Sequence, residues 1–359
     1  MIKFFRKNRN IDRHSIEDIV LAVTYECNSR CQFCNIWKSH TRFSCNPIYY
    51  NKLPLTMKNV NLSGGEPFLR DDLLDIIKII SRRSPKSKIV ISTNGFLPSK
   101  IKQTMQRVVK FRKDIGVAVS LDGFGKVHEE LRRFPGGFCL ATETIRLLKE
   151  LGIKNIKIAF TLGDNNIDQL KKVYQLSKES GIEFSLAVYH NSSHCFQIEK
   201  NQINNIRKIK KELNWLIEQE LKSFSPKKWL RAYFAYGLIK FLETKKRILP
   251  DYSGINSLFI DPFGKIYPSD VWNLEIGKLQ RIKDWNKFSK KAKKLILNNE
   301  CPNSWMICTA RQAMKKHWLE VIQWIIKKKF WLFIKSKKYK FKHSENQLSL
   351  FLKRVTSIF

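Results

Sequence analysis

The sequence predicts an α/β fold in which a partial (β/α)6 barrel, similar to a TIM barrel, precedes a mainly helical C-terminal extension with a short β-hairpin. Two observations support this prediction. From residue 17 to about residue 190, apolar β-branched segments alternate with amphipathic segments, which is the pattern of parallel strands covered by helices. After residue 195 the pattern changes to long helices and one hairpin. Six strand–helix units are two fewer than a closed eightfold barrel needs.

Six segments are predicted to be strands because each is short, apolar and rich in β-branched residues. In chain order they are 19–23, 59–62, 88–92, 116–120, 156–160 and 184–188. Helices are expected between them, near 71–82, 98–112, 139–151 and 166–180. Such a series predicts a parallel sheet whose C-terminal strand ends meet at one edge.

The second half of the chain is predicted to be mainly helical. Residues 198–222 and 226–247 have the apolar spacing of two long helices, and Pro226 fits the first turn of the second. Residues 257–272 indicate a hairpin that turns at 261–264, and another helix is expected near 281–298. The predicted divisions are a basic N-terminal segment (1–16), the barrel (17–195), a helical insert (196–249), a hairpin-bearing extension (250–314) and a basic amphipathic tail (315–359).

Composition excludes several classes of protein. Eight cysteines in 359 residues are too few for a disulfide scaffold. No window reaches the roughly 18 uninterrupted apolar residues of a membrane span, and the basic N-terminus lacks the apolar region of a secretory signal. We therefore expect a cytoplasmic protein in a reducing compartment, where clustered cysteines bind metal or perform catalysis.

Short polar motifs follow four of the predicted strands. The spacing C-x3-C-x2-C (27–34) follows the first strand, SGGEP (63–67) the second, TNG (93–95) the third and LDG (121–123) the fourth. Because the C-terminal ends of parallel strands meet, these motifs are expected to converge on one mouth. That convergence is stronger evidence for a functional site than any single motif.

The three clustered cysteines indicate a reactive metal centre. Three thiolates can hold three irons of a [4Fe–4S] cluster and leave the fourth iron open. An open coordination position distinguishes a reactive metal site from a closed structural one. The alternative is a zinc site that a distant ligand such as His40 or Cys45 completes. SGGEP at the next strand end favours the cluster.

Together, CNSRCQFC, SGGEP, TNG and SLDG resemble the motifs of the radical S-adenosylmethionine (radical SAM) superfamily over about residues 17–190. The resemblance implies an enzyme in which Cys27, Cys31 and Cys34 ligate one [4Fe–4S] cluster and S-adenosylmethionine binds the open iron. It also implies reductive cleavage of S-adenosylmethionine to methionine and a 5′-deoxyadenosyl radical that modifies a substrate. A reductant such as flavodoxin or ferredoxin would be a partner.

The resemblance also implies which residues contact S-adenosylmethionine. They are Phe33 beside the adenine, Gly64, Gly65 and Glu66 near the methionyl amine, Pro67 at the entry to the next helix, and Thr93, Asn94, Ser120 and Asp122 near the ribose or the methionyl carboxylate. Glycines suit this role because a ligand lying against backbone needs residues without a Cβ. The alternative for Asp122 is a simple turn. In HEELRR (128–133), which resembles the family's H-D-x-x-R-G segment, Arg133 replaces the glycine, so Arg132 is left without an assigned role.

Residues 250–314 resemble the SPASM or twitch extension, which binds auxiliary iron–sulfur clusters in related enzymes. Cys301 and Cys308 of the expected cysteine set are present. The other places are occupied by Asp251 or Tyr252, Ser269 and Ser304. Because two thiolates alone cannot hold a [4Fe–4S] cluster, we expect a degenerate extension that keeps the fold without an auxiliary cluster.

Other histidines and cysteines have weaker assignments. His190 and His194 follow the sixth strand and are expected at the mouth, either as ligands for substrate or metal or as ordinary loop residues. Cys139 opens an amphipathic helix and is expected in the core. Cys195 has no assignment.

The net charge of +36 is concentrated partly near the C-terminus. Residues 318–342 mix Trp318, Trp324 and Trp331 with lysines, and residues 327–329 interrupt the apolar run. This pattern fits a helix in a membrane interface, which would make the protein peripheral, or a helix docked on the domain with a solvated lysine face. No recognised nucleic-acid module accompanies the charge, so nucleic acid is not an expected partner.

Three functions remain in competition. The first is a radical enzyme that modifies a small or lipid-linked metabolite such as a polysaccharide precursor, which the helical insert and basic tail favour. The second is a peptide-maturing radical enzyme, whose usual auxiliary clusters are missing here. The third is a non-catalytic scaffold, against which the complete first cysteine motif and the intact SGGEP argue.

Overall fold

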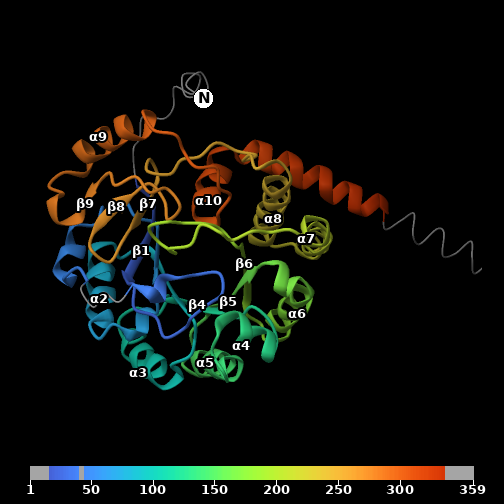
Figure 1. Ribbon diagram of the computed structural model, residues 1–359, viewed down its shortest axis with the longest axis horizontal. Helices are drawn as coiled ribbons and strands as arrows, with labels where there is room; N and C mark the ends of the chain where they lie inside the picture. The colour runs from blue at the N-terminus through green and yellow to red at the C-terminus, as the bar shows by residue number, and fades with distance from the viewer. Residues whose placement is uncertain (1–15, 40–43, 336–359) are drawn as a thin grey trace, which may run out of the picture.

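The structure, a computed structural model, describes residues 16–39 and 44–335. Its single sheet has nine strands in the order β6-β5-β4-β3-β2-β1-β7-β8-β9. The first six are β1 (Asp18–Thr24), β2 (Asn59–Gly64), β3 (Lys88–Thr93), β4 (Gly116–Ser120), β5 (Asn155–Leu162) and β6 (Glu183–Val188). They pair in parallel in chain order, and the sheet curves with helices outside it (Figure 1). This confirms the predicted partial barrel.

The helices on the outer face follow the predicted alternation. They are α2 (Leu73–Arg83), α3 (Pro98–Val108), α4 (Lys126–Arg132), α5 (Gly137–Glu150) and α6 (Leu170–Glu179). The prediction missed α4, because its seven residues are too few to show a helical period. Residues 164–169 form a 3-10 helix, η4 (Asp164–Gln169), in place of the expected first turns of α6, and Asn166 breaks the helical backbone there.

The predicted hairpin is present and also extends the barrel. Strands β7 (Ser257–Ile260) and β8 (Lys265–Tyr267) are antiparallel, and β9 (Gly277–Lys278) follows. Gly264 closes the turn with a left-handed φ of +80°. β7 also pairs in parallel with β1, a contact that the sequence did not predict. The C-terminal extension therefore lies directly beside the strand that leads into the cysteine motif.

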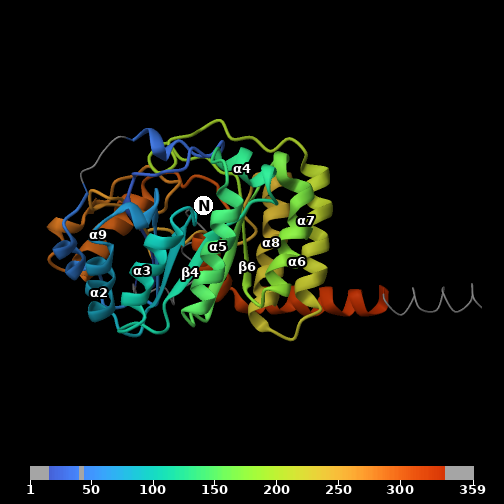
Figure 2. The same cartoon turned by 90° about the horizontal axis from the view of Figure 1, so that it is seen from below.

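Helices α7 (Ile206–Leu221) and α8 (Pro226–Thr244) pack against each other beside β6 (Figures 1 and 2). α7 begins eight residues later than the predicted 198, because the polar stretch 198–205 forms a loop in which Ile198 bridges to Ser192. α8 begins at Pro226 as predicted. The remaining elements are η1 (Ile36–Lys38), η2 (Pro47–Lys52), η3 (Pro67–Leu69), η5 (Leu279–Arg281), α9 (Trp285–Leu297), α10 (Ile307–Lys316) and a C-terminal helix over residues 318–335.

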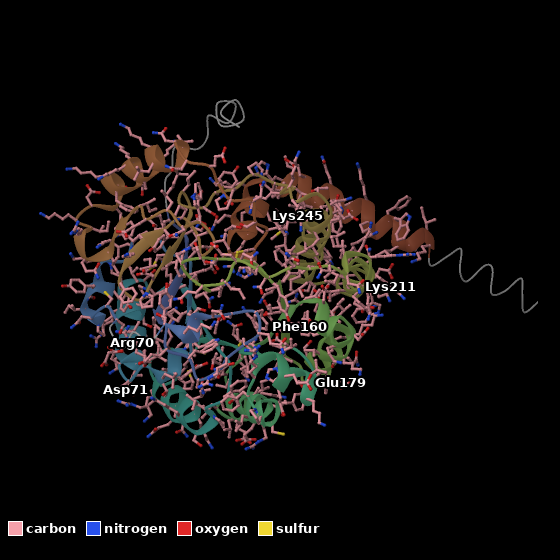
Figure 3. All side chains as sticks on the ribbon, in the orientation of Figure 1. Arg70, Asp71, Phe160, Glu179, Lys211 and Lys245 are labelled. Carbon is pink, nitrogen blue, oxygen red and sulfur yellow. The ribbon has the colours of Figure 1, made fainter. Side chains whose placement is uncertain are left out.

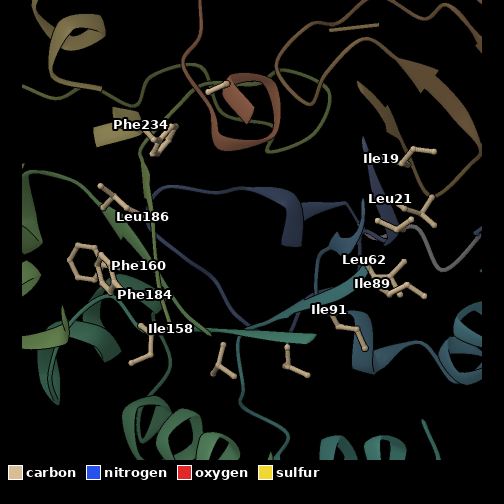
Figure 4. Close-up of a cluster of buried hydrophobic side chains, with 14 of the residues drawn as sticks. Ile19, Leu21, Leu62, Ile89, Ile91, Ile158, Phe160, Phe184, Leu186 and Phe234 are labelled. Carbon is tan, nitrogen blue, oxygen red and sulfur yellow. The ribbon is translucent and has the colours of Figure 1, made fainter. Parts of the chain in front are cut away.

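One continuous core joins the barrel to the extension. Figure 4 shows part of this core, with Ile19 and Leu21 of β1 on one side of the view and Phe160 of β5, Phe184 of β6 and Phe234 of α8 on the other. Charged side chains such as those of Lys211 and Lys245 lie on the outside, while Phe160 lies in the interior (Figure 3). The predicted barrel, helical insert and hairpin-bearing extension all contribute residues to this core. The boundaries between these divisions stay predictions.

Two further expectations can be compared with the structure. In the part of the chain that the structure describes, no helix is both long and apolar enough to cross a bilayer. The expectation that Cys139 is a core residue is wrong, because its side chain is exposed. α5 buries Ala141, Ile145 and Leu148, and Cys139 lies on the opposite side of that helix.

Candidate functional site

The four sequence motifs lie at the C-terminal ends of β1 to β4. Residues 25–34 leave β1 and form the cysteine loop, which lies at one end of the sheet with the loop that follows β6 (Figure 2). The two loops touch, because the amide of Asn201 donates to the carbonyl of Phe33 at 3.0 Å. We call this end of the sheet the mouth.

Three thiols occupy the cysteine loop. Cys31 is buried, and Cys27 and Cys34 are half-buried. The N–H of Ser29 lies 3.4 Å from Sγ of Cys27, and its hydroxyl lies 3.1 Å from Sγ of Cys31. Burial, reinforced by the neighbouring Cys31, raises the pKa of both Cys27 and Cys34. The thiolate form therefore needs a positive partner here, and a bound metal centre supplies one.

The donor set, three cysteine thiols on one loop, suits an iron–sulfur cluster, which takes each thiolate on a separate iron. Among residues 16–39 and 44–335, no group of three His, Cys, Asp or Glu side chains is arranged to hold a single metal ion. Cys45, a candidate fourth zinc ligand, is engaged elsewhere, since Gln280 donates to its Sγ at 3.4 Å. His40, the other candidate, lies outside the described residues.

Arg132 fastens the cysteine loop to the sheet. Its Nε donates to Oδ2 of Asp122 at 2.6 Å, and its NH1 lies 3.6 Å from Sγ of Cys31. Its carbonyl accepts from the hydroxyl of Ser29 at 2.9 Å and from the N–H of Arg30 at 3.2 Å. The sequence had left Arg132 without a role. The structure makes it the direct link between the predicted metal ligands and the end of β4.

Asp122 is fully buried and has a second attachment. Its Oδ1 accepts from the N–H of Thr161 on β5 at 2.7 Å. Its carbonyl accepts from the side-chain amide of Asn166 at 2.9 Å. Asp122 is therefore more than a turn residue, because it joins β4, β5 and α4 below the cysteine loop. Ser120 lies half-buried at the end of β4. Whether either residue contacts S-adenosylmethionine stays a prediction.

The two glycines after β2 are required by the backbone. A Cβ on Gly65 would lie 2.0 Å from the carbonyl oxygen of Glu26, and one on Gly64 would lie 2.2 Å from that of Thr24. The N–H of Gly65 donates to Thr24 at 2.8 Å, so the two strand ends are in direct backbone contact. Close approach of β1 and β2 therefore explains these glycines, in addition to the ligand contact that the resemblance implies.

Glu66 and Thr93 form a buried network behind the mouth. The carboxylate of Glu66 accepts from the hydroxyl of Thr93 at 2.8 Å, from the N–H of Asn94 at 2.7 Å and from the N–H of Phe68 at 3.2 Å. Burial raises the pKa of Glu66 to about 7, although these donors favour its ionised form. Pro67 begins η3 directly after it. The side chain of Glu66 thus ties β2 to β3.

Asn94 provides a second attachment for the cysteine loop. Its side-chain amide donates to Oδ1 of Asn28 at 2.7 Å, and its own oxygen accepts from the N–H of Phe96 at 2.9 Å. The loop is therefore held by Asn94 from β3 and by Arg132 from α4. Asn94 belongs to a motif that the sequence placed at a strand end, whereas Arg132 belongs to HEELRR (128–133), at the end of α4.

Sequence reasoning missed Tyr189, an aromatic neighbour of Phe33. The two rings stack with centroids 4.7 Å apart, and the guanidinium of Arg132 lies 5.2 Å from the Phe33 ring. A Cβ on Gly163 would lie 2.0 Å from the Tyr189 ring, so Tyr189 is seated on that glycine. The signal available in the sequence was its position directly after β6, at a strand end like those that carry the site motifs.

The two predicted histidines are packed, and neither belongs to a three-ligand metal group among the described residues. Nδ1 of His190 lies 3.0 Å from the carbonyl of Val188. His194 packs against Tyr267, and burial lowers its pKa to about 4. Nearby, the thiol of Cys308 donates to Asp270 at 3.9 Å. Burial raises the pKa of Asp270, and the neighbouring His190 partly offsets this effect.

At the expected auxiliary site, an arginine fills the space. Arg247 pairs with Asp251 at 3.2 Å, also contacts the carbonyl of Ser304, and its guanidinium lies 5.2 Å from the Trp305 ring. The thiol of Cys301 donates to Asp251 at 3.6 Å. Both Arg247 and Asp251 are largely buried. Asp251 is thus engaged by Arg247 and Cys301 in a buried ion pair, and the absence of an auxiliary cluster stays a prediction.

Comparison with known proteins is consistent with this geometry. Residues 21–177 match the family described as Radical SAM superfamily. A protein named Probable GTP 3′,8-cyclase from Metallosphaera sedula is 32% identical over 186 residues, which cover 48% of this chain and 56% of that protein. A protein of the same name from Sulfurisphaera tokodaii is 29% identical over 235 residues, covering 61% of this chain and 72% of that protein. This chain therefore spans little more than half of the first of these relatives.

Solved structures show the same fold. A structure described as Native anSMEcpe with bound AdoMet has a TM-score of 0.59 and 15% identity, and covers 86% of this chain and 99% of that chain. Streptococcus suis SuiB bound to S-adenosylmethionine has a TM-score of 0.54 and 18% identity, covering 71% of this chain and 60% of that chain. At these identities the likeness concerns the fold alone.

Proposed function

We propose a function from the premise that this chain belongs to the radical SAM superfamily. In this proposal the protein is an enzyme that cleaves S-adenosylmethionine reductively at its mouth and so modifies a bound substrate. The family uses a [4Fe–4S] cluster together with S-adenosylmethionine. The observation that supports the proposal most strongly is the cysteine loop, which Arg132 and Asn94 hold at the strand ends from two sides.

The residues of the mouth have distinct parts in this proposal. Cys27, Cys31 and Cys34 would hold the cluster. When bound, the cluster supplies the electron that cleaves the sulfonium C–S bond of S-adenosylmethionine. Arg132 places a positive charge 3.6 Å from Sγ of Cys31 and holds that side chain in the cysteine loop. The protein thus contributes positioning and charge, and burial of the site restricts access of water.

The part played by the predicted S-adenosylmethionine contacts is also proposed. Gly65 and Asn94 line the same loop from β2 and β3, where the resemblance places the methionyl group and the ribose. Phe33 is half-buried with one neighbouring ring, Tyr189, stacked on it. We propose that the adenine packs beside this aromatic pair, because flat apolar rings favour offset stacking.

The substrate class is proposed from the named relatives and from the charge of the chain. Relatives named GTP 3′,8-cyclase support an anionic nucleotide as the first candidate. The strongly basic chain would attract such a substrate. A lipid-linked or polysaccharide-precursor substrate stays a hypothesis, as does the peptide-modifying alternative. The Arg247–Asp251 pair in place of an auxiliary site does not favour the peptide alternative.

Partner and location complete the proposal. A reductant such as flavodoxin or ferredoxin would deliver the electron at the mouth. We propose a cytoplasmic location with peripheral membrane contact. A reducing compartment suits eight free cysteines, and the exposed face of residues 318–335 suits a membrane surface.

The test is production of 5′-deoxyadenosine and methionine by anaerobically reconstituted protein with dithionite. Wild type is expected to form both products, and a Cys27→Ala, Cys31→Ala, Cys34→Ala variant to form neither. Cys139→Ala is the matched control, because that thiol is exposed and is not among the predicted cluster ligands. The proposal is supported if the triple variant loses activity while Cys139→Ala keeps it. If wild type forms no product, the proposal fails and the non-catalytic scaffold becomes the better hypothesis.

The same assay tests the substrate class. GTP, a nucleotide sugar and a peptide are added separately, and 5′-deoxyadenosine is measured against the reaction without a second substrate. Stimulation of roughly tenfold by GTP would support the nucleotide candidate, since correct binding positions the reacting carbon. Stimulation by the peptide alone would favour the peptide-modifying alternative.

A further inference from the structure

The C-terminal helix (residues 318–335) exposes an apolar face that the proposed chemistry does not use. Six side chains make up this face, which we call the apolar stripe: Trp318, Leu319, Ile322, Ile326, Phe330 and Phe333. Each is between 43% and 63% exposed. Their spacing of three and four residues places them along one side of the helix. An exposed apolar face of this length marks a contact with a partner or a membrane.

The opposite side of the same helix fixes it to the body. Trp324 stacks on Tyr236 with ring centroids 4.8 Å apart and meets Tyr233 edge-on at 5.3 Å. Val321 and Ile325 are buried in the core. Lys335 pairs with Glu218 at 3.2 Å. The stripe is therefore held in a set orientation on the outside of the molecule, and the helix extends beyond α7 (Figures 1 and 2).

A second element adds to the exposed apolar surface. Phe224, in the turn between α7 and α8, is 91% exposed. Nζ of Lys329 lies 5.8 Å from the Phe224 ring and 4.0 Å from the Trp229 ring, so this turn adjoins the helix. Lys222 and Lys227 flank Phe224 in the sequence and are exposed. Two separate segments thus present apolar tips surrounded by lysines.

The charge around the stripe identifies its occupant. Residues 315–335 contain six lysines, at 315, 316, 327, 328, 329 and 335, against one glutamate, Glu320. A second copy of a chain with net charge +36 would be repelled by this surface. Nucleic acid would match the charge and leave the leucine, isoleucine and phenylalanine side chains without apolar partners. An anionic lipid surface satisfies both features, because it offers negative headgroups above an apolar layer.

We propose that the protein docks on anionic bilayers through the apolar stripe and Phe224, with its mouth facing away from the bilayer. The orientation follows from α7. Its N-terminal end adjoins the mouth, where the N–H groups of Asn204 and Asn205 donate to Asp164, and its C-terminal end leads to Phe224. Sixteen helical residues separate the two ends by about 24 Å. Figure 2 shows the mouth loops and the C-terminal helix at opposite ends of the molecule.

This orientation bears on the substrate. A bilayer-bound enzyme whose mouth opens to water receives soluble substrates directly, whereas a substrate whose reacting group stays at the membrane surface would not reach the mouth of the same molecule. The basic tail, one of the two features that favoured a lipid-linked substrate in the sequence, therefore ceases to support that hypothesis.

The experiment is flotation of the full-length reconstituted protein with vesicles of phosphatidylcholine, with and without about 30% phosphatidylserine. Binding is expected to be roughly tenfold stronger with phosphatidylserine and to fall roughly tenfold in Ile322→Ser, Ile326→Ser, Phe330→Ser. The matched control is Ile48→Ser, Leu55→Ser, Phe111→Ser, which removes three exposed apolar side chains elsewhere and should bind as wild type does.

Several results would overturn the proposal. They are no binding by wild type, unchanged binding by the stripe variant, and a wild-type dimer that the stripe variant converts to monomer in light scattering without lipid. Wild type would also fail to bind vesicles if another part of the chain covered the apolar stripe, and that result would equally overturn the proposal. Dithionite-driven cleavage of S-adenosylmethionine should be unchanged in the stripe variant, so failure of docking and failure of the radical chemistry are separate results.

Orientation is tested by quenching of tryptophan fluorescence with brominated lipid. Trp318 lies in the stripe, whereas Trp37 lies at the mouth, where its Nε1 donates to the carbonyl of Cys34 at 3.0 Å. Trp318→Phe is expected to reduce the quenching, to which Trp324 and Trp331 of the same helix also contribute, and Trp37→Phe is expected to leave the quenching unchanged. The reverse result would place the mouth against the bilayer and overturn the proposed orientation.

Discussion

Arg132 and Asp122 form a buried ion pair at the mouth, with Nε of Arg132 2.6 Å from Oδ2 of Asp122. The side chain of Arg132 is 9% exposed and that of Asp122 is 0% exposed. The same guanidinium contacts Sγ of Cys31 at 3.6 Å. One arginine therefore connects the sheet to a predicted cluster ligand, which makes it a positioning residue for the whole cysteine loop.

Arg132→Gln should weaken both the fold and the cluster site. It leaves Asp122 buried without its counter-ion, which costs about 3 to 5 kcal/mol of unfolding free energy. Urea unfolding of the cluster-free protein measures this cost, and iron content after reconstitution should also fall. Arg132→Lys should restore the positive charge but cannot contact Asp122 and Cys31 at the same time as the guanidinium does. It should therefore recover only part of the lost stability and iron content.

Arg146→Gln is the matched control for that experiment, because it breaks an arginine–carboxylate pair with Glu143 on the exposed surface of α5. Its stability and iron content should match those of wild type. If Arg132→Gln matched this control in unfolding free energy and iron content, the contact of Arg132 with Asp122 and Cys31 would contribute nothing to stability or to the cluster site.

Arg133→Gly should stabilise the protein. Arg133 ends α4 with a left-handed φ of 48°, a conformation that costs a residue with a side chain about 1 to 2 kcal/mol. Glycine adopts it freely but loses more chain entropy on folding, so the net gain should be under about 1 kcal/mol. The midpoint of urea unfolding should rise. Glu130→Gly, inside α4, should lower it, and equal effects at the two positions would contradict the argument.

Asp261→Asn should stabilise the protein above about pH 6. Burial raises the pKa of Asp261 from 3.8 to about 6, with Lys265 lowering it and Glu275 raising it to smaller extents. The folded state therefore holds a proton more tightly than the unfolded state, so this group's stabilising contribution is complete below pH 3.8 and is lost as the pH rises through 6. The loss has an upper bound of about 3 kcal/mol, at about 1.4 kcal/mol per pH unit.

Asparagine removes that titration and keeps the turn. Oδ1 of Asp261 accepts from the N–H groups of Phe263 and Lys265 at 2.9 and 2.8 Å, and an amide oxygen can accept from both. Unfolding free energies of the two proteins should diverge between pH 4 and pH 7 with Asp261→Asn the more stable at pH 7. Parallel curves over this range would show that the buried carboxylate does not set the pH dependence.

Cys301→Ser and Cys308→Ser should leave the iron content unchanged. Each thiol contacts one carboxylate, Asp251 or Asp270, and Arg247 fills the space beside Cys301. Loss of about four irons from either variant would instead mean that aspartate or serine completes an auxiliary cluster. Iron analysis of both variants against wild type decides between these outcomes.

Much of the barrel could be predicted from the sequence because each strand is a short apolar run. β4 (Gly116–Ser120) has the predicted bounds, and the other five strands differ by one or two residues at their ends. The parallel pairing of β7 with β1 could not be predicted, because SLFI (257–260) is buried throughout and its pattern does not identify a neighbour. Non-local pairing has no local signal in the chain.

The site divides in the same way. Motifs at strand ends identified Asn94 and Asp122, because topology alone brings strand ends together. The stacking of Tyr189 on Phe33 and the bridge from Arg132 to Cys31 depend on side-chain geometry, which spacing does not encode. The exposed position of Cys139 was missed because the core face of α5 is set by Ala141 and Ile145, two and six residues further along.

Iron and sulfide content with electron paramagnetic resonance tests the central claim most directly. Wild type and the Cys27→Ala, Cys31→Ala, Cys34→Ala variant are reconstituted anaerobically and compared. The structure and the family predict about four irons and a reducible [4Fe–4S] signal in wild type, with neither in the variant. Equal iron content in both proteins, or no iron in wild type, would contradict a [4Fe–4S] cluster held by these three cysteines at the mouth.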